Sequence, residues 1–154
     1  MIPRYCPEFG CREFKMLFSD WENIIEIFEE KFSDLVGSKF AISFPSGRAS
    51  LYSIIKSLNI SNGEIIIPSF SCVAVPVMIL ETNNIPVFAD ITMEDYNMKI
   101  NDVIKKVNKK TKAIIPTYMY GYPWDTKALR EQIDEDIIII EDAALALTTK
   151  DVGR

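Results

Sequence analysis

Four consecutive isoleucines followed by two carboxylates, residues Ile137–Asp142, constrain the fold of this chain more than any other stretch. A run of β-branched residues without polar alternation is typical of a strand buried on both faces, in the middle of a parallel sheet. In open α/β sheets, ligands bind outside the carboxyl ends of the strands, so acids at such a strand tip are well placed to meet a ligand. The same acids would also suit a cap on the following turn, and the pattern leaves both interpretations open.

Segments of the same kind alternate with helical patterns along the chain. Strands are expected at residues 39–44, 64–68, 85–90, 113–118 and 137–140. Helices are expected at residues 19–36, 46–58, 73–80, 101–107 and in the two turns after Asp125. The first helix opens with a Ser19–Glu22 capping box, carries apolar residues whose spacing predicts a core-facing side, and ends at Gly37. This fivefold alternation predicts an α/β fold with a mainly parallel sheet and helices on both faces.

The charge and the missing residue types argue against several classes of protein. A net charge of −5 argues against a nucleic-acid partner, and no apolar run is long enough to span a membrane. The chain contains no histidine, which removes His-based triads and HExxH zinc sites, and no metal site is predicted. Three cysteines without paired spacing, and an N-terminus without a signal-peptide core, predict free thiols and a cytoplasmic location.

Ser46, Gly47 and Arg48 stand between the first expected strand and the helix that follows it. Backbone amides at a helix start, a serine hydroxyl and an arginine cation together suit a phosphate, although a serine-capped helix with a solvated arginine explains the same residues. No GxxxxGK(S/T) or GxGxxG motif occurs, so a P-loop or dinucleotide fold has no support. Pyridoxal phosphate needs both a helix start for its phosphate and a carboxylate that keeps its pyridine nitrogen protonated.

Several stretches of the sequence resemble one family in order and in spacing. They lie at residues 32–39, 46–52, 63–71, 86–91, 111–116, 120–123 and 140–144. Together they resemble the DegT/DnrJ/EryC1/StrS family, the sugar aminotransferases among the fold-type I pyridoxal phosphate enzymes. The resemblance implies the N-terminal part of the aspartate aminotransferase-like large domain. Residues 1–18 would form an N-terminal arm and residues 19–154 a partial cofactor-binding domain.

The resemblance also implies roles for individual residues. Ser46, Gly47 and Arg48 would lie at the phosphate of pyridoxal phosphate, and Asp142 would pair with its pyridinium nitrogen. Cys72 stands where many relatives place an aromatic ring that stacks on the cofactor, so a sulfur contact is expected there.

Some positions depart from the family pattern. Arg48 replaces a common threonine, Tyr118 a common histidine, and Leu145 the glutamine or histidine that reaches the pyridine hydroxyl, a bond that leucine cannot make. The family's Schiff-base lysine lies downstream of the Asp142 motif. Lys150 is too near the strand tip to match it, so no catalytic residue is assigned within the chain.

For the parent protein, the resemblance implies an aminotransferase that transfers an amino group from an amino-acid donor such as glutamate to a keto sugar nucleotide. Such enzymes serve cell-surface polysaccharide or amino-sugar biosynthesis and work as homodimers. The chain covers under half of a family member. We therefore expect it to be inactive alone, its strand at 40–43 to lack a neighbour, and its strand at 137–140 to present an open edge. Two alternatives remain: a non-catalytic remnant that binds a partner subunit or a sugar nucleotide, and a dehydratase of the same family.

Overall fold

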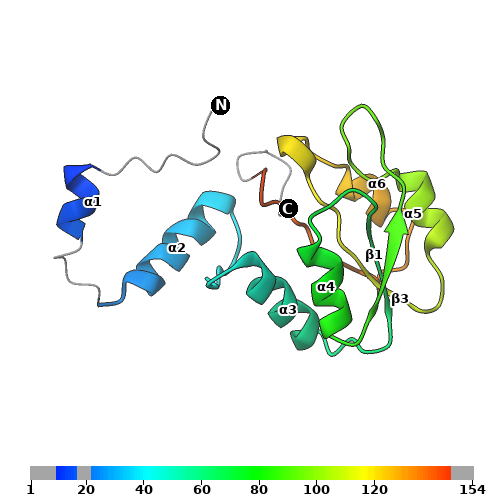
Figure 1. Ribbon diagram of the computed structural model, residues 1–154, viewed down its shortest axis with the longest axis horizontal. Coiled ribbons are helices and arrows are strands. Elements are labelled where there is room, and N and C mark those ends of the chain that lie inside the picture. The colour runs from blue at the N-terminus through cyan, green and yellow to red at the C-terminus, as the bar shows by residue number, and fades with distance from the viewer. Residues whose placement is uncertain (1–9, 17–21, 147–154) are drawn as a thin grey trace.

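The computed structural model describes residues 10–16 and 22–146, and a four-stranded sheet forms the centre of the described part (Figure 1). Its strands are β1 (Glu64–Pro68), β2 (Ile85–Ala89), β3 (Thr111–Ile114) and β4 (Ile138–Ile139). They lie in the order β2-β1-β3-β4, and every pair of neighbours is parallel. Strand β1 has the bounds that the sequence predicts, and the α/β fold with a parallel sheet is confirmed.

One face of the sheet is covered by α3 (Gly47–Ser57) and α4 (Ala74–Glu81), which pack against each other. We call it the α3/α4 face. Alternate residues of a strand point to opposite sides of a sheet, so this face collects every second residue of each strand. Its buried cluster consists of Ile55, Ile65, Ile67, Val75, Ile79, Ala113 and Ile115. The partly buried Ile138 and Ile140 pack against this cluster.

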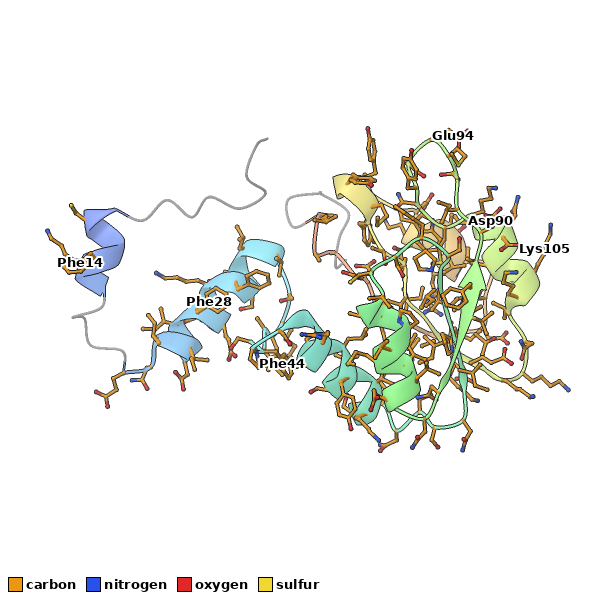
Figure 2. The ribbon with its side chains drawn as sticks, viewed as in Figure 1. Phe14, Phe28, Phe44, Asp90, Glu94 and Lys105 are labelled. Atoms are coloured by element: carbon orange, nitrogen blue, oxygen red, sulfur yellow. The ribbon has the colours of Figure 1, made fainter. Side chains whose placement is uncertain are left out.

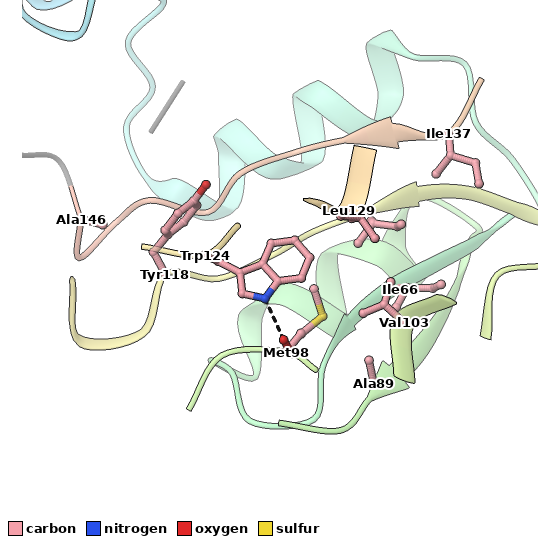
Figure 3. Close-up of a cluster of buried hydrophobic side chains, with 10 residues drawn as sticks. Ile66, Ala89, Met98, Val103, Tyr118, Trp124, Leu129, Ile137 and Ala146 are labelled. Atoms are coloured by element: carbon pink, nitrogen blue, oxygen red, sulfur yellow. Dashed lines mark hydrogen bonds between the residues drawn. The ribbon is translucent and has the colours of Figure 1, made fainter. Parts of the chain in front are cut away.

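The opposite face is covered by α5 (Ile100–Lys106) and α6 (Thr126–Arg130), and we call it the α5/α6 face. Its buried cluster is drawn in Figure 3 and includes Ile66, Val103, Ile114, Tyr118, Trp124 and Leu129. The indole of Trp124 donates a hydrogen bond of 2.7 Å to the carbonyl oxygen of Met98, which satisfies the polar atom of a nearly buried ring. Helices therefore cover both faces, as predicted.

The isoleucine run at residues 137–140 occupies a different place from the central one that its apolar pattern alone predicts. Among the described residues, β4 is an edge strand rather than a central one, and it is only two residues long. Its side chains are half-buried, whereas Ile65, Ile66 and Ile67 of the central β1 are fully buried. The open edge expected for this strand is present in the described part of the chain.

The first predicted strand, at residues 39–44, does not pair with any strand among the described residues. Phe40 and Ile42 are 74% and 73% exposed. What fixes the segment locally is a carboxylate: the backbone amide and the hydroxyl of Ser43 donate to Glu29 at 2.6 and 2.8 Å. The backbone bond, then the hydroxyl bond, lowers the pKa of Glu29 below its ordinary value of 4.5. The 39–44 segment has a strand-like sequence pattern but no neighbouring strand among the described residues, and it is therefore irregular.

The N-terminal part of the described chain holds α1 (Cys11–Met16) and α2 (Ile24–Val36), with α1 inside the segment predicted as an irregular arm. Helix α2 ends at Val36 and is capped by Gly37, whose φ of 68° matches the predicted stop. Its predicted core-facing side is wrong for the described residues: no residue of α2 is buried, and side chains such as Phe28 stand clear of the sheet layers (Figure 2).

Two expectations for this region involve residues outside the described part. They are the capping serine Ser19 and the domain boundary after residue 18. In the residues that the structure describes, no helix is both long and apolar enough to cross a bilayer.

Candidate functional site

All four strands are parallel, so their carboxyl ends meet at one rim of the sheet, which we call the carboxyl rim. Asp142 lies at this rim, three residues beyond β4, where it forms a parallel bridge with Thr117. The amide of Asp142 donates to the carbonyl of Pro116 at 2.8 Å, and the amide of Tyr118 donates to the carbonyl of Asp142 at 3.0 Å. These bonds extend the pairing of β3 with β4, so the backbone fixes the position of Asp142.

The side chains of Thr117 and Asp142 point toward the α3/α4 face. Ile115 and Ile140 belong to the cluster on that face, and each stands two residues before the bridged pair. With the period of two that a strand imposes, Thr117 and Asp142 continue the same two rows at the carboxyl rim. Thr117 was missed in the sequence. Counting by twos from the end of a predicted strand is the signal that finds it.

The neighbouring acid, Glu141, has a different environment on the α5/α6 face. Its Oε1 accepts hydrogen bonds of 2.9 Å from the hydroxyl of Tyr118, which is fully buried, and from that of Thr126. Asp142 also holds the following turn, because its Oδ1 accepts the amide of Ala144 at 3.3 Å. The capping interpretation is therefore correct for one carboxylate oxygen of Asp142, and Glu141 is held by the core.

Helix α3 brings the predicted phosphate-binding residues to the same rim. The hydroxyl of Ser46 accepts the amide of Ala49 at 3.2 Å and caps the helix. Helix α4 follows the carboxyl end of β1 and leads into the start of β2, and α3 leads into the start of β1. Figure 1 shows the two helices side by side and both ending at the amino rim. The start of α3 therefore lies toward the carboxyl rim, on the face to which Asp142 points.

The residues at the start of α3 are open to a ligand. Ser46, Gly47 and Arg48 are exposed, and a Cβ built on Gly47 would meet no heavy atom within 4 Å. The first amides of a helix have no partner within the helix, and its dipole favours an anion there. In the described part of the chain, the side chain of Arg48 forms no hydrogen bond or ion pair, so its guanidinium is available for an anion.

Cys72 completes the set of predicted residues. It lies in the loop between β1 and α4 as an exposed free thiol, and its carbonyl accepts the amide of Val75 at 3.0 Å. The structure thus brings Ser46, Gly47, Arg48, Cys72 and Asp142 to one rim. No hydrogen bond or ion pair between described residues joins the start of α3 to Asp142.

A pocket of about 690 Å³ lies elsewhere, beside α5, and contains none of these five residues. Asp90 and Lys105 line it, and Figure 2 labels both. Asp90 forms an ion pair of 2.9 Å with Lys99, whose hydrogen bond lowers the pKa of this acid. Because this pocket contains none of the predicted residues, we place the candidate site at the carboxyl rim.

Comparisons with known proteins identify the family of the chain. A model of the DegT/DnrJ/EryC1/StrS aminotransferase family matches residues 18–154. The GDP-perosamine synthase of Vibrio cholerae is 35% identical over 164 residues, which cover 100% of this chain and 45% of that protein. The crystal structure of DesV from S. venezuelae, in complex with a ketimine intermediate, matches with a TM-score of 0.74 at 30% identity, over 78% of this chain and 33% of that one.

A further solved structure supports the fold alone. The crystal structure of 3-amino-5-hydroxybenzoic acid synthase matches with a TM-score of 0.86 at 23% identity, over 92% of this chain and 40% of that one. The chain therefore spans less than half the length of these relatives. The chain belongs to the DegT/DnrJ/EryC1/StrS aminotransferase family.

Proposed function

We propose that the protein to which this chain belongs is a pyridoxal-phosphate-dependent aminotransferase. It would transfer an amino group from an amino acid such as glutamate to the keto group of a nucleotide-linked sugar. One observation carries this proposal: a helix start suited to a phosphate and the carboxylate of Asp142 occupy one rim and one face of the sheet. Relatives named GDP-perosamine synthase and UDP-2-acetamido-2-deoxy-3-oxo-D-glucuronate aminotransferase support the substrate class.

The residues at this rim fit the cofactor. The free amides at the start of α3 and the guanidinium of Arg48 would hold the phosphate, and Gly47 leaves room for its close approach. Asp142 would hold a proton on the ring nitrogen, because an opposite charge nearby favours the protonated form. When bound, the cofactor supplies an electron sink for negative charge that develops on the substrate carbon. The exposed thiol of Cys72 would contact the ring.

Other parts of the proposal extend beyond this chain. We assign the Schiff-base lysine to no residue of the chain, so the transfer reaction itself is proposed only for a protein that includes a longer stretch. A homodimer, a cytoplasmic location and a role in cell-surface polysaccharide or amino-sugar biosynthesis are proposed from the family resemblance.

Pyridoxamine 5′-phosphate tests the site without the lysine, because this form of the cofactor forms no Schiff base with the protein. We expect the chain to bind it in isothermal titration calorimetry, and Asp142→Ala to weaken binding at least about tenfold, which equals about 1.4 kcal/mol. Asp136→Ala, which changes an exposed acid before β4, is the matched control and should bind as the unmodified chain does. A chain that is folded by circular dichroism but does not bind, or equal binding by Asp142→Ala, would contradict the proposal.

A further inference from the structure

The hydroxyl of Thr117 is buried in an unusual way. Its Oγ1 is closed to solvent and, among the described residues, has no hydrogen-bond partner. A buried hydroxyl without a partner destabilises a folded chain, because it has lost its bonds to water and gained none. Native structures keep few such groups, and functional sites are one place where they occur.

On the β4 side, the position of this hydroxyl relates it to Asp142. Thr117 and Asp142 are partners in a parallel bridge, so their side chains leave adjacent strands on the same face, about 5 Å apart. The residues that directly precede them in these two rows are apolar: Ala113 and Ile115 before Thr117, and Ile138 and Ile140 before Asp142. The carboxylate of Asp142 is therefore the polar side chain of these rows that the hydroxyl can meet.

A hydrogen bond between the two side chains requires only a small movement. A threonine hydroxyl changes place by one rotation about the Cα–Cβ bond, between staggered positions. The Oδ1 atom of Asp142 is held by the amide of Ala144, while no hydrogen bond of Oδ2 to a described residue is present. The second carboxylate oxygen is thus open both to Thr117 and to a ligand.

We propose that Thr117 is a positioning residue for Asp142. When a ring nitrogen occupies the site, the hydroxyl of Thr117 donates a hydrogen bond to the Asp142 carboxylate and holds it toward that nitrogen. The unpartnered hydroxyl of the ligand-free chain is then a group kept for the ligand-bound state. This inference rests on the proposed function, because it requires a protonated ring nitrogen at Asp142.

Two substitutions separate the hydroxyl from the shape of the side chain. Thr117→Val keeps the shape and removes the hydroxyl, whereas Thr117→Ser keeps the hydroxyl. Without ligand, we expect the valine variant to unfold at the same temperature as the unmodified chain or higher, because it loses an unpaired group. With pyridoxamine 5′-phosphate it should bind about five- to tenfold more weakly by calorimetry. The serine variant should bind as the unmodified chain does.

A spectroscopic reading distinguishes positioning from a merely structural effect. The absorbance of the bound ring reports the pH at which its nitrogen loses a proton, and Thr117→Val should lower that pH because the carboxylate is held less firmly. In an Asp142→Asn background, Thr117→Val should have no further effect on binding, since the two residues act as a pair.

The remaining outcomes separate a failure of the proposed function from a failure of the positioning role of Thr117. If the unmodified chain fails to bind the ligand, both the proposed function and this inference are overturned. If it binds and Thr117→Val matches it in affinity and in titration, the positioning role alone is overturned. A clear loss of thermal stability in ligand-free Thr117→Val would also overturn it, because the hydroxyl would then have a partner in the ligand-free state.

Discussion

A carboxylate on the loop after β2 shows how a single residue joins distant segments. Asp95 accepts a hydrogen bond from the hydroxyl of Thr92, and two from Asn97, through its amide at 3.0 Å and its side chain at 3.2 Å. Asn97, which is almost fully buried, in turn accepts the amide of Met119 at 3.0 Å and donates to the carbonyl of Tyr122 at 3.3 Å. Asp95 therefore fixes the residue that connects the loop after β2 to the turn after β3.

The charge of Asp95 makes this connection sensitive to acid. Burial raises the pKa of Asp95, but the hydrogen bonds from Thr92 and Asn97 outweigh it, so the pKa lies below its ordinary value of 3.8. A depressed pKa contributes stability that is present above 3.8 and is lost as the pH falls through the pKa of the folded state.

We expect Asp95→Asn to be less stable than the unmodified chain at pH 6, by about 1 kcal/mol, because it replaces hydrogen bonds to a charge. The difference should shrink as the pH falls below 3.8, where the unmodified chain loses the same contribution. Urea unfolding between pH 6 and pH 3 measures the stability difference and its decrease with pH. Asp136→Asn, an exposed acid, is the control and should follow the unmodified chain. A difference that stays constant over this range would show that the Asp95 charge contributes no stability.

At the scale of elements, the start of α3 serves two purposes that one substitution can separate. Ser46 caps the helix, so Ser46→Ala should lower the free energy of unfolding by about 1 kcal/mol. Ser46→Asp keeps a capping oxygen and adds a charge that the helix dipole favours, so its stability should equal or exceed that of the unmodified chain. The added charge should nevertheless repel a phosphate and abolish binding of pyridoxamine 5′-phosphate.

Thermal unfolding and calorimetry on the same samples check this prediction. Ser57→Ala removes a hydroxyl from the other end of α3, where it donates to the carbonyl of Ile54 at 2.8 Å, and should leave ligand binding unchanged. Retained binding in Ser46→Asp would mean that the start of α3 does not hold the phosphate.

The sequence predicts elements best where their causes are local. A capping serine and a strand of buried isoleucines give the start of α3 and the bounds of β1, and the strand tip gives Asp142. Thr117 was missed because its importance depends on which residue of the neighbouring strand lies beside it. The register in which two strands pair cannot be deduced from the sequence of one strand alone. Whether the 137–140 run lies at an edge or in the centre depends on which strands pair with it, and its apolar pattern is the same in both places.

The dependence of strand pairing on distant segments also explains why the strand predicted at residues 39–44 does not form. Backbone pairing needs a distant partner, whereas the pattern of Phe40, Ile42 and their neighbours records only a preference for extended structure. The N-terminal helix α2 shows the limit for helices. Its periodic apolar residues predict a helix and a face, and the helix forms, but the periodicity does not show what covers that face.

At the scale of the whole molecule, an unpaired strand edge and several exposed apolar side chains are present together. Within the described part of the chain, the outer edge of β4 is unpaired, and Leu35, Phe40 and Ile42 are each more than 70% exposed. An open strand edge pairs readily with another chain, and grouped apolar side chains promote association. The two buried clusters on the faces of the sheet are separate from these surfaces. Association and folding stability are therefore expected to respond to different substitutions.

We expect the isolated 154-residue chain to associate in a concentration-dependent manner, and the double substitution Phe40→Lys, Ile42→Lys to weaken that association. The melting temperature should stay nearly constant, because both side chains are already exposed in the folded chain. Val73→Lys is the matched control: Val73 is 75% exposed but belongs to the loop before α4 and not to the 39–44 segment. Sedimentation velocity at several concentrations measures the effect. If the unmodified chain is monomeric throughout, or if the control weakens association as much as the double variant, these side chains do not drive association.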